Sequence, residues 1–275
     1  MELAQQYPAY GFAKLFHLVR NMGHRWNHKR IHRIYCALKL NFRRKGKKRL
    51  PGRHPVPLEV PQKENSCWSL DFMSDALSNG RRFRTFNVID DYSREVLAIE
   101  IDLSLPSKRV IRVLDRLVEY RGTPMKIRMD NGPEFISVEL AGWAEKKGII
   151  LEYIQPGRPM QNGYIERFNK SYRTEVLDMY LFRTLDEVRG ITSKWMAEYN
   201  EVRPHESLDN LPPRAFLMKN NGKISNLQCA GIHRSPQNRA RRCRQRHDRH
   251  RDGPLLRHGS REELEAHERG IAQGI

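Results

Sequence analysis

Short β-type segments and helical segments alternate along residues 67–180, and this alternation limits the folds open to the chain. The β-type segments are rich in branched and aromatic residues and are bounded by turn residues; they cover 67–73, 82–90, 94–103, 125–129 and 148–154. Helical periodicity covers 107–122, 138–148 and 164–180. The polar turn Asp-Asp-Tyr-Ser joins the second and third β-type segments and predicts a hairpin. The order predicts an α/β domain whose mixed five-stranded sheet is flanked by helices.

The apolar positions also predict which helical faces are buried. In the helix over 107–122 the expected buried residues are Val110, Val113, Leu114, Leu117 and Val118. In the helix over 164–180 they are Ile165, Phe168, Tyr172, Val176 and Met179. On that second helix a neighbouring face holds Glu166, Lys170 and Arg173 at spacings of four and three.

Positive charge is concentrated at the two ends of the chain. The formal net charge is +18; residues 1–60 carry +12, residues 61–220 are balanced, and residues 221–275 carry +6. A charge so placed predicts a polyanion partner, and we expect double-stranded DNA. The four cysteines are widely scattered and no apolar run reaches membrane-spanning length, so we expect a cytoplasmic protein with no membrane partner.

Residues 1–45 predict a small all-α domain. An apolar period over 12–22 ends at Gly23, and Asn27 is placed to cap a second helix. We expect Ile31, Ile34, Tyr35 and Leu38 on one face of that helix and the candidate DNA contacts His28, Lys29, His32 and Arg33 on the other. This arrangement is typical of a helix-turn-helix, and a solvated helical hairpin is the alternative.

A basic, proline-rich segment follows and predicts an extended linker over 46–66. Prolines stand at 51, 55, 57 and 61, which excludes a regular element. The cations at and before its start could track phosphates, and we include them among the DNA contacts: Arg43, Arg44, Lys45, Lys47 and Lys48.

Three acids occupy positions that suit a metal centre. Asp71 lies within an apolar β-type segment, Asp130 ends a later one, and Glu166 lies in the first turn of a helix. Each has a structural alternative: Asp130 could cap a turn, and Glu166 could complement the helix dipole. Asp90 and Asp91 have only the turn interpretation. Together the three acids could hold two Mg²⁺ ions, which prefer oxygen ligands and serve displacement at phosphorus.

The spacing of these acids and the sequence motifs around them resemble those of a known family. Because 35 residues separate Asp130 from Glu166, the set resembles the D, D(35)E signature of the retroviral-integrase superfamily of ribonuclease-H-like folds. Five motifs resemble the second-reading-frame product (OrfB) of bacterial insertion-sequence transposases: WSLDFM, IDDYSRE, MDNGPEF, QPGRPMQNGYIERFNKSYRTEVL and YNEVRPHESL. The resemblance covers about residues 7–218.

The resemblance implies a role for particular residues. Asp71, Asp130 and Glu166 match the catalytic, metal-binding acids, with two Mg²⁺ ions for which Mn²⁺ can substitute. Further matches are the turn after the second acid (Asn131, Gly132, Glu134), the loop before the catalytic helix (Gln161, Asn162, Gly163) and the contacts to terminal DNA (Lys170, Arg173). Gln161 and Asn162 are also expected to contact DNA. The implied chemistry is cleavage of element ends and transfer of the 3′-OH into DNA. A homo-multimer on DNA and a first-reading-frame (OrfA) partner are expected.

The sequence leaves other interpretations open. The catalytic core is expected over 67–219, and residues 220–275 predict a basic, disordered tail that could be a frameshift product; residues 221–275 contain 11 Arg and no Phe, Trp or Tyr. A ribonuclease-H-like nuclease without strand transfer is one alternative. A decayed, non-catalytic DNA-binding protein is another.

Overall fold

A computed structural model of the chain describes residues 1–41, 61–155 and 159–220. The predicted linker contacts from Arg43 to Lys48, most of the linker itself and the predicted tail lie outside the described residues. None of the helices in the described ranges is long and apolar enough to cross a membrane.

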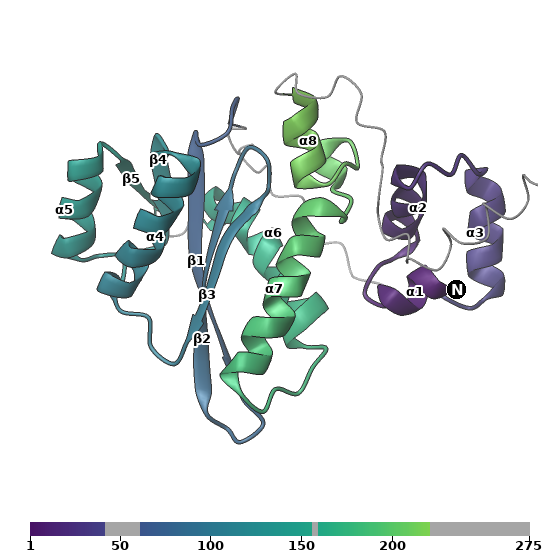
Figure 1. Cartoon of the computed structure of the whole chain (residues 1–275), viewed down its shortest axis with the longest axis horizontal. Coiled ribbons are helices and arrows are strands. Elements are labelled where there is room, and N and C mark those ends of the chain that lie inside the picture. Colours follow the sequence, from purple (N-terminus) through teal and green to yellow (C-terminus); the bar gives the residue numbers. More distant parts are fainter. Residues whose placement is uncertain (42–60, 156–158, 221–275) are drawn as a thin grey trace, which may run out of the picture. The chain divides into compact units, whose positions relative to one another are not determined.

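The central domain is built on a mixed five-stranded sheet, as the sequence predicts (Figure 1). Its strands are β1 (Cys67–Ala76), β2 (Arg82–Asp90), β3 (Val96–Asp102), β4 (Lys126–Met129) and β5 (Ile150–Tyr153). The spatial order is β3-β2-β1-β4-β5. The two strand pairs β1–β2 and β2–β3 are antiparallel, whereas β1–β4 and β4–β5 are parallel. The predicted hairpin is therefore confirmed as β2–β3.

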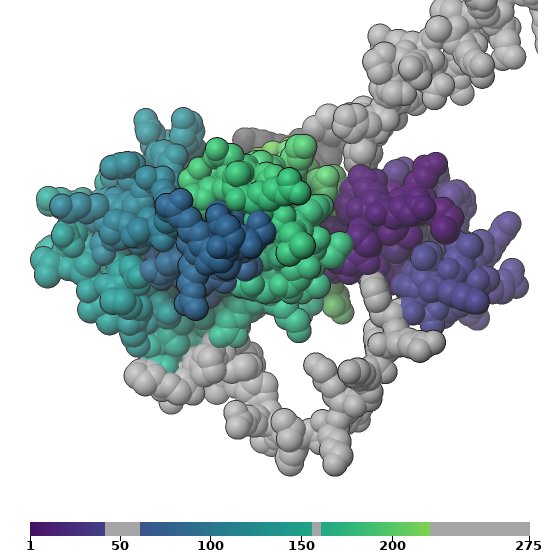
Figure 2. Space-filling model, turned by 90° about the horizontal axis from the view of Figure 1, so that it is seen from below, coloured from purple at the N-terminus to yellow at the C-terminus, as the bar shows by residue number. Residues whose placement is uncertain are grey.

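Helices cover both faces of this sheet and make three layers (Figures 1 and 2). Helices α4 (Ser107–Arg121) and α5 (Val138–Lys147) pack on one face, and α6 (Gly163–Tyr172) and α7 (Leu185–Glu201) pack on the other. Local signals set the ends of α5: the Ser137 hydroxyl accepts from the Leu140 N–H, and Gly148 adopts the left-handed conformation. These layers bury two apolar clusters, one on each side of the sheet.

Alternation along the two central strands decides which side chains meet α6. On β1, Leu70 and Phe72 face the cluster under α4 and α5. Asp71 lies between them and therefore points to the α6 face. On β2, Phe86 belongs to the α4 side, which puts Asn87 on the α6 side. The alternation of side chains along β1 and β2 thus places Asp71 and Asn87 on the sheet face that α6 covers.

The helical region after residue 163 differs from the expected single helix. Helix α6 ends at Tyr172 and continues as a π-helical turn over Arg173–Leu177. Met179 was expected on the buried face, but this expectation is wrong because the helix has ended, and Met179 is 46% exposed. Two later helices were not predicted: α7, which Thr184 opens with a capping box, and α8 (Pro213–Asn220).

The N-terminal residues form three helices, α1 (Glu2–Gln6), α2 (Phe12–Asn21) and α3 (His28–Ala37). The Asn27 side chain caps α3 by accepting from the Lys29 N–H, as predicted. The expected faces of α3 are partly wrong. Tyr35 is buried, but Ile34 and Leu38 are exposed. The reason is that aromatic contact orients α3, because the rings of His28 and His32 pack edge-on against Phe12 at 5.1 and 4.7 Å between centroids.

Candidate active site

Asp71 lies in the middle of β1, on the sheet face that α6 covers. Its Oδ1 accepts from the Phe72 N–H at 2.8 Å, and its Oδ2 accepts from the Asn169 side-chain amide of α6 at 2.6 Å. Burial, together with the negative charges of Asp130 and Glu166, raises the pKa of Asp71 to about 6, although the hydrogen bonds from Phe72 and Asn169 act to lower it. The carboxylate of Asp71 therefore lies within the electrostatic reach of both other acids.

Asp130 stands level with Asp71 on the neighbouring parallel strand. Strand register pairs Ser69 with Arg128, and Asp71 and Asp130 each follow two residues later. Asp130 is exposed, and its Oδ1 accepts from the Gly132 N–H at 3.2 Å. It therefore caps the turn that follows β4, as the structural alternative predicted. The turn also places the Asp130 carboxylate just beyond the carboxyl end of β4. One of its oxygens accepts from the turn, and the other has no hydrogen-bond partner among the described residues.

Gly132 leaves space beside this carboxylate. A Cβ at that position would lie 3.2 Å from Asp130 Oδ1 and 3.6 Å from Glu134 Oε2. A side chain at residue 132 would therefore crowd Asp130 Oδ1, the oxygen that accepts from the Gly132 N–H and holds the turn. The absence of a side chain at Gly132 thus belongs to the turn that presents the Asp130 carboxylate.

Glu166 lies in the first turn of α6 and is exposed. Ile165 and Phe168 on the same helix are fully buried, so the packing of α6 fixes the direction in which Glu166 points. Within residues 1–41, 61–155 and 159–220, no Lys or Arg forms an ion pair with Asp71, Asp130 or Glu166. Among the residues that the structure describes, the three acids therefore have no cationic side chain as an ion-pair partner.

The donor chemistry of this site fits a hard divalent cation, since all three side chains offer carboxylate oxygens. In the described part of the chain, no three His, Cys, Asp or Glu side chains are already arranged as a ligand set. The carboxylates share an electrostatic field without converging on one point.

An arginine that the sequence did not single out ties the segments of Asp71 and Asp130 together. The Arg84 guanidinium of β2 lies 4.4 Å from the ring centroid of Phe72 and donates to Glu134 in the turn after Asp130. This contact lowers the pKa of Glu134. The Ser107 hydroxyl also bonds the Glu134 carbonyl at 2.7 Å. The turn is consequently held to both β2 and α4.

The predicted DNA contacts lie in different environments. Lys170 is exposed on α6, near Glu166. The Arg173 guanidinium instead donates to Asp75 and to the Ser74 carbonyl, each at 2.8 Å. The Gln161 Oε1 accepts from the Gln155 N–H at 2.9 Å, and Asn162 is buried. In the N-terminal helices His28, Lys29 and Arg33 are exposed, as is His32. Their contacts with DNA remain predictions.

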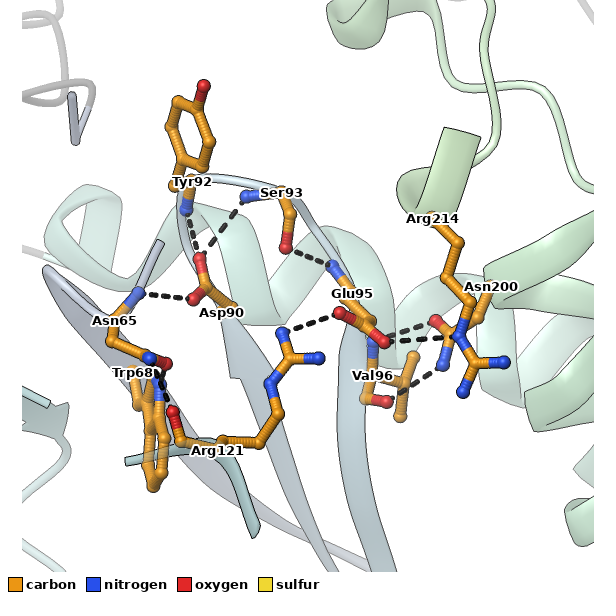
Figure 3. A network of polar contacts seen from close by, with 10 residues as sticks. All are labelled: Asn65, Trp68, Asp90, Tyr92, Ser93, Glu95, Val96, Arg121, Asn200 and Arg214. Carbon is orange, nitrogen blue, oxygen red and sulfur yellow. Dashed lines mark hydrogen bonds and ion pairs between the residues drawn. The ribbon is translucent and has the colours of Figure 1, made fainter. Parts of the chain in front are cut away.

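Asp90 and Asp91 are much more than turn residues, because both are fully buried near the start of β1. Asp90 accepts from the backbone N–H groups of Asn65, Tyr92 and Ser93 at 2.7 to 3.2 Å (Figure 3). Asp91 accepts from the Ser69 hydroxyl at 2.6 Å and from Arg128 at 3.0 Å. These acids have satisfied partners and a structural role.

Comparisons with known proteins place the chain in a family. The family model described as an integrase core domain matches residues 61–159, and a second model with the same description matches residues 147–213. The insertion element IS407 uncharacterized 31.7 kDa protein of Burkholderia multivorans is 41% identical over 219 residues, covering 80% of this chain and 79% of that protein. The insertion element IS476 uncharacterized 39.2 kDa protein of Xanthomonas euvesicatoria is 38% identical, covering 78% and 62%.

A solved structure shares the fold. The chain resembles a protein in the cryoEM structure of a simian T-cell lymphotropic virus intasome in complex with the PP2A regulatory subunit B56 gamma, with a TM-score of 0.51 and 16% identity. The match covers 70% of this chain and 64% of that one. The mixed sheet with helices on both faces is accordingly the ribonuclease-H-like integrase fold. The chain belongs to the bacterial insertion-sequence transposases with an integrase catalytic core.

Proposed function

We propose that this chain cuts the ends of its insertion element and joins them to new DNA, with Asp71, Asp130 and Glu166 as the catalytic acids. One observation carries the proposal: strand register sets Asp71 and Asp130 level on neighbouring parallel segments, and α6, which carries Glu166 in its first turn, covers this face of the sheet and contacts Asp71 through Asn169. No cation among the described residues forms an ion pair with these acids. Divalent cations suit these acids, because such ions prefer carboxylate oxygens and would offset the repulsion between the negative charges.

The acids would hold two Mg²⁺ ions, or Mn²⁺ in their place. When bound, such ions supply activation of the attacking oxygen and stabilisation of the leaving oxygen. The protein contributes the positions of its carboxylates. Asp71 is held by two hydrogen bonds, Asp130 is presented by its turn, and Glu166 is oriented by the buried face of α6. Fixing these groups before the reaction lowers the reorganisation that the chemistry requires.

The substrate we propose is double-stranded DNA, both as element ends and as target. Lys170 is exposed one helical turn beyond Glu166, where it can contact a terminal phosphate. The exposed cations of α3 can bind a second DNA segment. Because two element ends must be joined, we propose a homo-multimer on DNA, with a first-reading-frame protein as a further partner.

A supercoiled plasmid that carries the element ends tests this function. Wild-type protein with Mg²⁺ or Mn²⁺ should make end-specific nicks and joined products, while Glu166→Gln should bind the same DNA without cutting it. Glu139→Gln is the matched control, because Glu139 is an exposed acid in the first turn of another helix, α5, and should leave activity intact.

The other outcomes separate the alternatives. Nicks at element ends without joined products would favour a nuclease. Binding without cutting by the wild type, with or without a first-reading-frame partner, would favour a decayed DNA-binding protein. Equal activity of Glu166→Gln and wild type would remove Glu166 from the site.

A further inference from the structure

Two asparagines form a hydrogen-bonded chain that ends at Asp71. The Asn169 Nδ2 of α6 donates to Asp71 Oδ2 at 2.6 Å, and the Asn87 Nδ2 of β2 donates to Asn169 Oδ1 at 2.7 Å. Register places Asn87 directly opposite Asp71 on the neighbouring antiparallel strand. The amide of α6 thus spans two side chains that face it from adjacent strands.

The carboxylate of Asp71 decides which groups donate and which accept in these two hydrogen bonds. An ionised carboxylate only accepts hydrogen bonds, so Asn169 must turn its amine toward Asp71 and its oxygen toward Asn87. Asn87 must then donate, and its own Oδ1 points away. That oxygen is buried and has no hydrogen-bond partner among the described residues. Asn87 therefore orients Asn169 at a cost to its own hydrogen bonding.

A fully buried amide with an unpaired oxygen destabilises a strand in which an apolar residue would fit. Within the described residues, the one hydrogen bond of the Asn87 side chain is the bond that it donates to Asn169. Asn87 acts on Asp71 through Asn169, which lies three residues after Glu166 on the same helix. The residue that orients Asp71 is therefore fixed to the element that carries Glu166.

We propose that Asn87 and Asn169 are positioning residues that hold Asp71 in the orientation required for a divalent cation and set its placement relative to Glu166. The inference rests on the proposed function. A carboxylate has about four lone-pair sites, so the two hydrogen bonds to Asp71 leave sites for an ion. Outer-shell partners of metal ligands typically change metal affinity by 10- to 100-fold when they are lost.

Mn²⁺ binding to the full chain, measured by the loss of the free Mn²⁺ electron paramagnetic resonance signal, tests the proposal without an activity assay. Asp71→Asn defines the binding that depends on Asp71. Asn87→Val should weaken that binding about tenfold while the protein keeps its fold and its affinity for DNA, because valine suits a buried strand position.

Thr85→Val is a matched control. Thr85 lies two residues earlier on β2, on the same face, and is also fully buried with an unpaired side-chain oxygen. It does not belong to the asparagine chain, so its replacement should leave Mn²⁺ affinity unchanged. An equal loss of affinity in Thr85→Val and Asn87→Val would overturn the proposal, since general loosening of β2 would then explain both.

A double variant tests whether the two asparagines act together. If Asn87 works only through Asn169, adding Asn87→Val to Asn169→Leu should cause no further loss of Mn²⁺ affinity beyond Asn169→Leu alone. Additive losses, or an Asn87→Val protein that binds Mn²⁺ like the wild type, would overturn the inference while the proposed function stands. Wild-type protein without Asp71-dependent Mn²⁺ binding would instead overturn the proposed function itself.

Discussion

Two groups of acids lie near one another in the sheet and have opposite surroundings. Asp91 is fully buried and has a buried arginine, Arg128, at 3.0 Å. Asp130 and Glu166 are exposed, and no cation in the described ranges pairs with either of them or with Asp71. A buried charge without a partner strongly destabilises the fold, whereas an exposed carboxylate is solvated by water and needs no partner until a ligand binds.

Beside Asp91, the buried polar residues Asp90, Glu95 and Asn200 join distant parts of the chain (Figure 3). Glu95 at the hairpin turn accepts from Arg121 of α4 at 2.6 Å and from Arg214 of α8 at 3.4 Å. The Asn200 side chain of α7 exchanges two hydrogen bonds, each 2.9 Å, with the backbone of Val96. One region therefore uses polar groups to hold the fold, and the other leaves them available for chemistry.

The largest effect on stability should come from Arg128→Met. The change removes the buried guanidinium from Asp91 and leaves this carboxylate with the Ser69 hydroxyl, the Cys67 thiol and the charge of Arg94. We expect a loss of about 3–5 kcal/mol in unfolding free energy. Urea denaturation measures it. Arg109→Met is the control: Arg109 pairs with Glu100 at 2.7 Å but is 34% exposed, so it should cost at most about 1 kcal/mol. Similar losses of unfolding free energy in the two variants would contradict the proposed difference between buried and exposed ion pairs.

A smaller loss should follow Asn65→Gly. Asn65 adopts a left-handed conformation, and its side chain bonds the Arg121 carbonyl and the Trp68 indole at 2.8 and 3.1 Å. Glycine keeps the backbone conformation and removes both side-chain bonds, so we expect a loss of about 1–3 kcal/mol. Asn65→Ala should be worse than glycine because alanine is strained there. If alanine and glycine destabilise equally, the backbone argument fails.

His205 should make stability depend on pH. Burial, with Arg203 nearby, holds the pKa of His205 well below its usual 6.5. The unfolded chain binds a proton below that value and the folded chain does not, so stability is present above pH 6.5 and falls as pH drops. The slope is at most about 1.4 kcal/mol per pH unit.

Denaturation midpoints at pH 7.5 and 5.5 measure this effect. His205→Phe keeps a ring beside Tyr199, which lies 4.7 Å away, and should show a shallower pH dependence. An unchanged dependence would mean that other groups cause it.

The smallest effect on stability should come from Asp130→Asn. Its carboxylate is exposed and asparagine can still accept from the Gly132 N–H, so the unfolding free energy should change by no more than about 0.5 kcal/mol. DNA cleavage should nevertheless fall at least a hundredfold, since Asp130 is a proposed ligand rather than an outer-shell residue. A stable variant with full activity would remove Asp130 from the catalytic set.

The sequence alone determined the order of the five strands and of helices α4, α5 and α6, together with the candidate acids. Strand alternation, helical period and a cap such as Asn27 are local properties, and sequence patterns reveal them. Helix α7 was missed although its capping box at Thr184 is local, and other predictions were wrong where packing decides the outcome. The orientation of α3 depends on Phe12, and the π-helical turn after Tyr172 ends the stripe that Met179 was expected to continue.

Only the tertiary structure showed which acids have a cationic partner and which do not. Asp71 and Asp91 both stand in or beside apolar strands, and neither shows in its own neighbourhood of sequence whether a cation will face it. Arg128 reaches Asp91 from β4, 37 residues away, and Asn169 reaches Asp71 from α6, 98 residues away. The physical reason is that burial and partner charges, which set the cost of each carboxylate, arise only when strands and helices pack.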